Sequence, residues 1–162
     1  GFGGAIEWKG FDVSIFFQGT ARVSLFEEGS TIVPFSSGYK NNDGFLRGVM
    51  ENRWTVDNPD PNARYPRTIR PSDALDNNNT KKSSFWVRNA AFLRLKNAEI
   101  GYTFPKRWME KMAIQNLRLY VSGVNLLTWA PDVHLFDPDL GSGDGRKYPP
   151  TRVFNVSLNI NF

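Results

Sequence analysis

The sequence has no cysteine and a single histidine, His134, among its 162 residues. Disulfides and thiolate metal sites are therefore excluded, and nothing in the sequence places a Ser-His-Asp triad or a histidine-based metal site around His134. The formal net charge is +4, but no run of Lys and Arg is longer than two residues, so no nucleic-acid-binding surface is predicted. We expect no catalytic residue, no metal and no cofactor.

Long apolar runs are also missing. A membrane-spanning helix needs about 20 consecutive apolar residues, and no such run occurs. A membrane-spanning strand needs only about 9–11 residues, and its alternating polarity gives a much weaker signal. Aromatic residues, in contrast, are abundant: they make up 14% of the chain, with 13 Phe and 5 Trp.

Alternation of apolar and polar residues predicts an all-β chain. Five strands are expected, at about residues 2–8, 11–18, 85–104, 116–129 and 152–162. Lys9-Gly10 would join the first two in a tight hairpin. A change of phase near Lys96-Asn97 predicts a β-bulge, because one extra residue reverses the facing of everything beyond it. Pro105 would end the third strand and open a short helical turn over 105–115.

The connections alternate between short turns and the long loops expected at 19–84 and 130–150, which are rich in Gly, Asn, Asp, Pro and Ser. Outer-membrane barrels combine short periplasmic turns with long extracellular loops. If the last strand ends in the periplasm, both short turns lie there and both long loops face outside. The last strand supplies an apolar row that suits lipid, consisting of Phe154, Val156, Leu158, Ile160 and Phe162. Asn and Ser residues between them suit a wet lumen.

Other interpretations of the same pattern stay open. A water-soluble β-sandwich with one buried face gives the same alternation, so a soluble all-β carbohydrate- or protein-binding module is the main alternative. A small enzyme with acidic catalysis in a loop, through Asp57 or Asp139, is a third hypothesis without a convergent motif. Five strands cannot close a transmembrane barrel, since the smallest have about eight. A membrane barrel would therefore make this chain part of a larger whole.

Several segments resemble one known family. In order, "FWVRNAAFLRLKNAEIGYTFPKRW", "NLRLYVSGVNLLTW", "FDPDLG" and "YPPTRVFNVSLNINF" resemble the C-terminal end of the SusC/RagA family of TonB-linked outer-membrane transporters. The stretch "WKGFDVSIFFQG" resembles an earlier hairpin of that region, and "NRWTVDNPDPNARYPR" resembles its long loop. The resemblance covers nearly all 162 residues, and it identifies residues 1–162 as the C-terminal segment of one β-barrel domain.

The resemblance implies an activity and partners. Family members are barrels of about 22 strands with a plugged lumen, located in the outer membrane of Bacteroidota. They import glycans or peptides with a SusD-like surface lipoprotein, driven by the TonB complex. The resemblance thus implies a transporter segment that contacts lipid, the lipoprotein and an oligosaccharide or peptide substrate, and that meets the TonB complex only through the missing N-terminal part. The terminal Phe162 also resembles the C-terminal signal that is read by the barrel-insertion machinery.

Loop aromatics are the candidate contact residues. Phe35, Tyr39, Trp54, Tyr65, Trp86 and Trp129 could stack on sugar rings, pack against a lid protein or anchor the loops to each other. Of these, Trp54, Tyr65, Trp86 and Trp129 are the residues we select for substrate or partner contact. The stretch "FDPDLGSGDGRK" is only a partial calcium loop, because Tyr148 stands where the bidentate Glu belongs. A solvated turn is therefore favoured over a calcium site at 137–148.

Overall fold

The computed structural model describes residues 1–28, 46–68, 79, 81–110, 113–141 and 147–162. The chain divides into two compact units. The first, here called the sheet unit, comprises Gly1–Ala21, Ala91–Ala130 and Pro150–Phe162. The second, the loop unit, comprises Arg22–Ala90 and Pro131–Pro149. Each unit is described by itself below.

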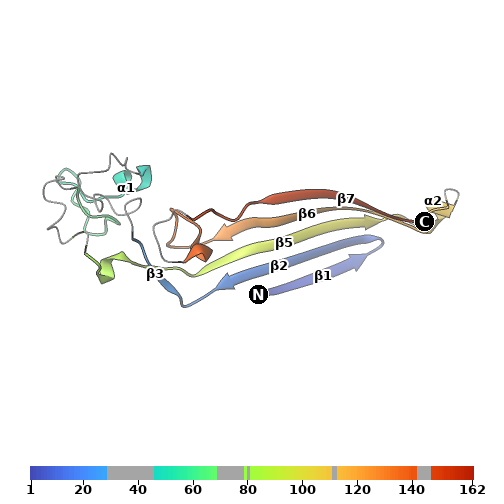
Figure 1. Cartoon of the computed structure of the whole chain (residues 1–162), viewed down its shortest axis with the longest axis horizontal. Coiled ribbons are helices and arrows are strands. Elements are labelled where there is room, and N and C mark those ends of the chain that lie inside the picture. The colour runs from blue at the N-terminus through green and yellow to red at the C-terminus, as the bar shows by residue number, and fades with distance from the viewer. Residues whose placement is uncertain (29–45, 69–78, 80, 111–112, 142–146) are drawn as a thin grey trace. The chain divides into compact units, whose positions relative to one another are not determined.

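The sheet unit is one antiparallel sheet in the order β1-β2-β5-β6-β7 (Figure 1). Its strands are β1 (Phe2–Trp8), β2 (Phe11–Thr20), β5 (Phe92–Thr103), β6 (Asn116–Trp129) and β7 (Val153–Asn161). A single turn of helix, α2 (Lys106–Met109), follows Pro105 and connects β5 to β6, as predicted. Neighbouring strands of the sheet run in opposite directions, so this unit is an up-and-down meander.

A two-residue hairpin joins β1 to β2. Lys9 and Gly10 both have positive φ, at 49° and 87°, which is the requirement of a type I′ turn. The backbone here also lies close to β5, since Thr103 donates its N–H to the carbonyl of Gly10 at 2.7 Å. A Cβ atom at Gly10 would lie 2.8 Å from the carbonyl oxygen of Thr103. Glycine is therefore needed at this position for both its φ and the close contact.

The predicted β-bulge is confirmed at Lys96. Phe16 of β2 pairs with Asn97 of β5, while the next residue, Phe17, pairs with Leu95. Lys96 is thus the extra residue of β5, and the two phases of the β5 sequence lie on a consistent face of the sheet. A register shift on the β6 side occurs at the same level, where Asn125 has a positive φ of 54°.

The loop unit holds short elements and two small cores. Its elements are β3 (Ser24–Phe26), α1 (Arg47–Glu51), β4 (Val87–Asn89) and the two 3₁₀ turns η4 (Ser84–Trp86) and η6 (Pro138–Leu140). β3 pairs with β4 in an antiparallel two-stranded sheet. One buried cluster contains Val49, Tyr65 and Trp86, with Leu135 packed against it. The other contains Leu25, Ala90 and Val133.

The expected strand at 85–104 is wrong in its first part. Residues 84–86 form η4, residues 87–89 form β4 in the loop unit's own sheet, and β5 begins only at Phe92. The break has a physical cause, because Trp86 is buried in the first core cluster and the N–H of Ala90 donates to the carbonyl of Val23 at 2.9 Å. The expected loop at 19–84 likewise contains β3, α1 and the last two residues of β2. None of the helices in the described ranges is long and apolar enough to cross a membrane.

Two glycines of the first hairpin should respond differently to substitution. Gly10→Ala should lower the free energy of unfolding by about 1–2 kcal/mol, because alanine disfavours the left-handed backbone. Gly4→Ala is the control, since Gly4 has no atom within 4 Å of its Cβ position and no positive φ. Denaturant midpoints of the two variants would check this. A Gly4→Ala variant as unstable as Gly10→Ala would contradict the prediction.

Candidate functional site

One face of the sheet carries only apolar or aromatic side chains and glycine. Directly paired residues in antiparallel strands project to the same face, so the register defines the set. From β1 to β7 it comprises Phe2, Gly4, Ile6, Trp8, Phe11, Val13, Ile15, Phe17, Gly19, Leu93, Leu95, Ala98, Ile100, Tyr102, Leu117, Leu119, Val121, Gly123, Leu127, Trp129, Phe154, Val156, Leu158 and Ile160. We call this the apolar face. It spans all five strands without a charged residue.

The apolar face is open to the surroundings. Phe154 is 68% exposed, Val156 74% and Leu158 57%, and Ile6 at the opposite edge is 69% exposed. Soluble monomers rarely expose contiguous apolar patches larger than a few hundred Å². A face five strands wide therefore needs a cover, either lipid or another protein.

Aromatic rings gather at both ends of this face. Near the short turns, the ring of Tyr102 lies 4.6 Å from that of Phe11 and 5.1 Å from that of Phe104. Phe104 in turn lies 6.1 Å from Trp108. At the far end, the ring of Phe17 lies 5.2 Å from Phe2 and 6.4 Å from Trp129. Aromatic side chains at two levels with aliphatic residues between them match the paired girdles of a membrane barrel.

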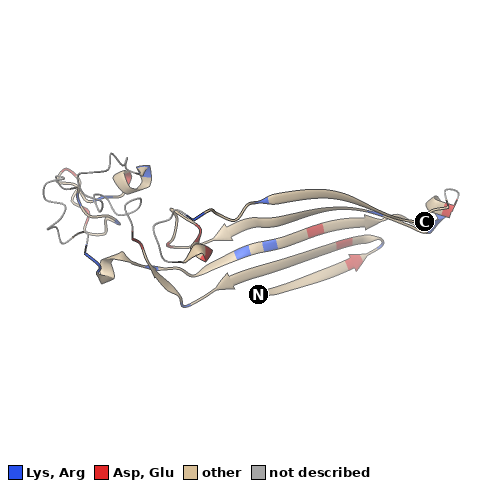
Figure 2. Cartoon of the chain, in the orientation of Figure 1, with Lys and Arg blue, Asp and Glu red and all other residues tan. Residues whose placement is uncertain are grey.

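The opposite face of the sheet, the polar face, carries the charges. Lys, Arg, Asp and Glu are sparse along the strands (Figure 2). Apart from Lys96 in the bulge, the charged residues of the five strands are Glu7, Asp12, Arg94, Glu99 and Arg118, and all five project from this face. Polar and charged groups are thus separated from the apolar face through the whole width of the sheet.

An ion cluster bridges three strands on the polar face. The Nε of Arg118 on β6 donates to Oδ1 of Asp12 on β2 at 3.0 Å, and its Nη2 contacts Glu99 on β5 at 2.6 Å. The guanidinium also lies 4.5 Å from the ring of Tyr120. Gly101 lies between the partners, and a Cβ there would come within 2.6 Å of Arg118 Nη2 and 2.7 Å of Asp12. Because Gly101 has no side chain, Arg118 on β6 can reach Asp12 on β2 across β5.

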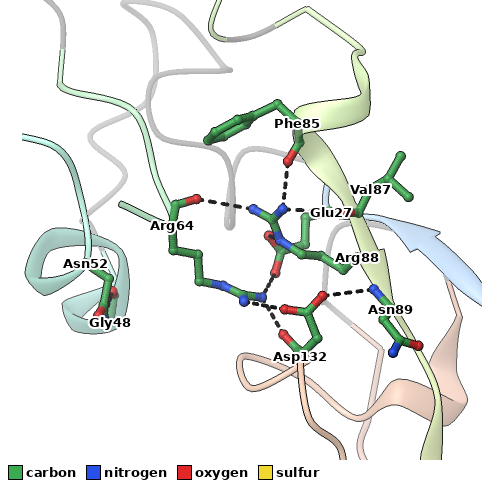
Figure 3. A network of polar contacts seen from close by, with 9 residues as sticks. All are labelled: Glu27, Gly48, Asn52, Arg64, Phe85, Val87, Arg88, Asn89 and Asp132. Carbon is green, nitrogen blue, oxygen red and sulfur yellow. Dashed lines mark hydrogen bonds and ion pairs between the residues drawn. The ribbon is translucent and has the colours of Figure 1, made fainter. Parts of the chain in front are cut away.

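The loop unit is held together by a second, more buried network (Figure 3). The fully buried carboxylate of Glu27 accepts from Arg64 Nη2 at 3.0 Å and from Arg88 Nε at 2.8 Å. Arg64 Nη1 contacts Oδ1 of Asp132 at 2.6 Å, and Oδ2 of Asp132 accepts the backbone N–H of Asn89 at 2.9 Å. Four segments that are distant in sequence are thereby joined, because the residues come from positions 27, 64, 88–89 and 132.

Both arginines of the network also bind backbone. Arg88 donates to the carbonyl of Phe85 at 2.7 Å and to that of Arg64 at 3.2 Å. Burial disfavours the charged form of Arg64, but hydrogen bonds to Asp132 and Tyr65 and the charge of Glu27 outweigh it and raise its pKa. Burial similarly opposes ionisation of Asp132, yet hydrogen bonds from Arg64 and Asn89 hold its pKa below the ordinary value. Arg64 and Asp132 therefore stay charged at neutral pH.

The structure corrects part of the candidate contact set. Tyr65 and Trp86 are only 2% and 3% exposed, and they pack in the loop unit's first core cluster. The expectation that they offer surfaces to a ligand is therefore wrong, because their rings already contact Val49 and each other. Trp54 is half-buried, and its backbone N–H donates to the backbone carbonyl of Tyr65 at 2.9 Å.

The remaining candidates fall in three places. Trp129 is 50% exposed and belongs to the apolar face, where its ring lies 6.4 Å from that of Phe17. Phe154, Val156, Leu158 and Ile160 also lie on the apolar face, and Phe162, which follows β7, is 80% exposed. Phe35 and Tyr39 lie outside the described residues.

The described part of the chain holds no group of three His, Asp or Glu side chains that could bind a metal ion. In the partial calcium loop, the carboxylate of Asp137 accepts the N–H of Asp139 at 2.9 Å and caps η6. Residues 142–146 of that loop, including Asp144, lie outside the described residues.

Comparisons with known proteins find relatives that match along the whole length of this chain. No family model matches the chain. TonB-dependent receptors P3 and P26 of Formosa agariphila are 29% and 28% identical over 100% of this chain and 16% of their own. The RagAB peptide transporter matches with a TM-score of 0.65 and 24% identity, over 96% of this chain and 16% of that one. The RagAB peptide importer in the closed-closed state matches with a TM-score of 0.64 and 23% identity, over the same shares.

These matches confirm two predictions. The chain resembles TonB-linked outer-membrane proteins along its whole length, and its fold is an antiparallel up-and-down sheet that corresponds to part of a β-barrel. The relatives are named receptors and transporters, not enzymes, which agrees with the expectation of no catalytic chemistry. The chain spans only 16% of the length of the curated relatives it matches.

Glu27 should be the most sensitive charged residue of the loop unit. Glu27→Gln removes the charge that two guanidinium groups share, and it should destabilise the unit by about 2–3 kcal/mol. Glu51→Gln is the control, because Glu51 forms only an exposed pair with Arg47 and should change stability by less than about 0.5 kcal/mol. Hydrogen exchange at the amides of Trp86, Asn89 and Ala90 would measure the effect. Equal exchange rates in the two variants would contradict the role of Glu27.

The loop unit should also loosen in acid. The pKa of Asp132 is lowered in the folded state from 3.8, so its contribution to stability is present above that value and is lost as the pH falls through the folded pKa. Exchange protection of the Asn89 amide should therefore drop below about pH 4. In Asp132→Asn this particular pH step should be absent. A step of unchanged size in the variant would exclude Asp132 as its source.

Proposed function

We propose that this chain supplies five strands and two long outer loops to the barrel of a TonB-dependent importer in the outer membrane of a Bacteroidota-like bacterium. The imported nutrients are oligomers, with glycans and peptides as the candidate classes. The observation that carries the proposal is the apolar face, since it is continuous over five strands and exposed. Four of the five strands have 9–14 residues and so reach the length needed to cross a bilayer, which is about 9–11 residues.

Placing lipid against the apolar face explains several features together. The two aromatic clusters would lie at the two membrane interfaces, and the aliphatic rows of β6 and β7 between them would face the hydrocarbon region. The polar face, with its amide, hydroxyl and ion-paired side chains, would line the lumen. Each edge strand would pair with a further strand of the complete barrel, because an unpaired strand edge is costly in lipid.

The short turns would face the periplasm, and the two long loops would face the outside. A SusD-like surface lipoprotein is the proposed partner of the outer loops, and Trp54 is the remaining loop aromatic proposed to contact it or the substrate. The TonB complex would act through the part of the importer outside this chain. The similarity to RagAB, which is described as a peptide importer, supports import as the activity. The assembly-signal role of Phe162 stays a prediction.

Uptake measurements would test the activity. A strain that lacks the intact receptor should fail to take up its labelled oligosaccharide or peptide, and the plasmid-borne gene should restore uptake only when TonB is functional. Uptake that is independent of the receptor would contradict the importer proposal. A cooperatively folded, monodisperse 162-residue chain in buffer without detergent would favour the soluble binding module instead.

Arginine substitutions along β7 would test the assignment of the two faces. In the intact protein, Val156→Arg or Leu158→Arg should destabilise the inserted barrel by about 2–4 kcal/mol if the site is at mid-membrane depth, because each places a charge in hydrocarbon. Ser157→Arg, between them, is the matched control, since it projects from the polar face and should be mild. Denaturant unfolding from lipid vesicles would measure this. Equal costs at Ser157 and Leu158 would overturn the assignment.

A further inference from the structure

Basic side chains gather where the sheet unit has its two short turns, here called the short-turn end. Lys9 lies in the β1–β2 turn, and Lys106 and Arg107 lie in α2. All three are exposed, and none of them forms an ion pair with a residue that the structure describes. Arg118 on the polar face, in contrast, already binds two carboxylates. The three cations of the short turns are therefore available to a partner.

The two turns lie at the same end of the sheet (Figure 1). Thr103, at the end of β5, donates its N–H to the carbonyl of Gly10 at 2.7 Å, and α2 begins at the third residue after it. Carboxylates are fewer here than cations. Glu7 of β1 projects from the polar face. Glu110, which follows α2, is the one side-chain carboxylate that the structure describes within the two turns. The short-turn end therefore carries an excess of positive charge.

The cations border one of the aromatic clusters of the apolar face. The Nζ atom of Lys9 lies 4.8 Å from the centre of the Trp8 ring, which belongs to the apolar face and is 66% exposed. Trp108 follows the two cations of α2 directly, and its ring lies 6.1 Å from that of Phe104. Exposed aromatic rings with cations beside them match the order of groups at a membrane interface, where the rings lie below the level of the phosphates.

We propose that the short-turn end binds the phosphate groups of anionic phospholipids and selects them over zwitterionic ones. Ammonium and guanidinium groups form charge-assisted hydrogen bonds with phosphate oxygens. An acidic protein would match the cations alone, whereas a lipid matches the cations with its phosphate and the exposed rings with its glycerol and acyl groups. The inference rests on the proposed function, because the short-turn end reaches lipid headgroups only if the apolar face contacts lipid.

Lipid retention by the intact protein would test this selectivity. The protein is reconstituted in vesicles of equal parts phosphatidylcholine and phosphatidylglycerol and extracted in mild detergent, and the lipids that stay bound are quantified by mass spectrometry. Phosphatidylglycerol should be enriched about fivefold or more, the effect of one basic residue near an anionic surface. The triple variant Lys9→Gln, Lys106→Gln, Arg107→Gln should retain the two lipids equally, and Lys9→Gln alone should lower the enrichment.

Two matched variants serve as controls. Exchanging the cations for each other, as Lys9→Arg, Lys106→Arg and Arg107→Lys, keeps the charge and should keep the enrichment. The variant Lys81→Gln, Lys82→Gln, Lys147→Gln removes the same charge from exposed positions of the loop unit and should also keep it. NaCl at about 0.5 M during extraction should abolish the enrichment by screening. Inorganic phosphate at constant ionic strength should not, because it lacks the apolar part of a lipid.

Heat-modifiable migration on gels, recorded for the same preparations, separates this inference from the proposed function. An unaltered protein that never forms a barrel would overturn the proposed function. A folded barrel that retains both lipids equally would overturn the lipid selectivity alone. The same conclusion would follow if the triple glutamine variant or, where that variant does not fold, Lys9→Gln were as enriched in phosphatidylglycerol as the unaltered protein. Loss of the enrichment with inorganic phosphate would assign the three cations to soluble anions instead of lipid.

Discussion

The apolar face of the sheet has to stay free of charged side chains even where the alternation of apolar and polar residues along a strand changes phase. This constraint governs the structure of the sheet unit. In β5, apolar residues before the bulge are spaced as Leu93 and Leu95, whereas those after it are spaced as Ala98, Ile100 and Tyr102. In a regular strand these two sets would project to opposite sides. Lys96 is an extra residue in the bulge and shifts the pairing of β5 with β2 by one position. Both sets therefore lie on the apolar face. The partition of charges, the aromatic clusters and the exposure of the apolar rows all depend on this correction.

The loop unit has little apolar burial and is stabilised in a different way from the sheet unit. Its described segments are rich in Asn and Pro, and its two cores contain only a few buried side chains each. So little apolar burial leaves much backbone entropy uncompensated. The carboxylates of Glu27 and Asp132 add directional contacts, because each binds Arg64 while also reaching Arg88 or the backbone of Asn89. A buried charge network of this kind can favour one arrangement of the segments that it joins.

The features that could be predicted from the sequence are the local ones. Alternation locates the strands, the Lys9-Gly10 pair indicates the hairpin, and the phase change in the third strand predicts the bulge. Contacts between distant partners could not be predicted. Glu27 and Arg88 are separated by 61 positions, and Arg64 and Asp132 by 68, so no spacing rule connects them. Turn-rich composition suggests exposed loops and hence exposed aromatics, whereas the burial of Tyr65 and Trp86 depends on a core assembled from four distant segments.

Gly101 has a consequence for assembly. The ion pair between Asp12 and Arg118 passes over β5 only where that strand has no side chain. If β5 paired two residues out of register, Glu99 or Thr103 would occupy the gap and the guanidinium could not reach across. A shift by one residue would bring Ile100 or Tyr102 there and reverse both faces. The ion pair between Asp12 on β2 and Arg118 on β6 can therefore form only when β5 pairs with both strands in the correct register. The ion pair thus favours the correct register of β5 during folding.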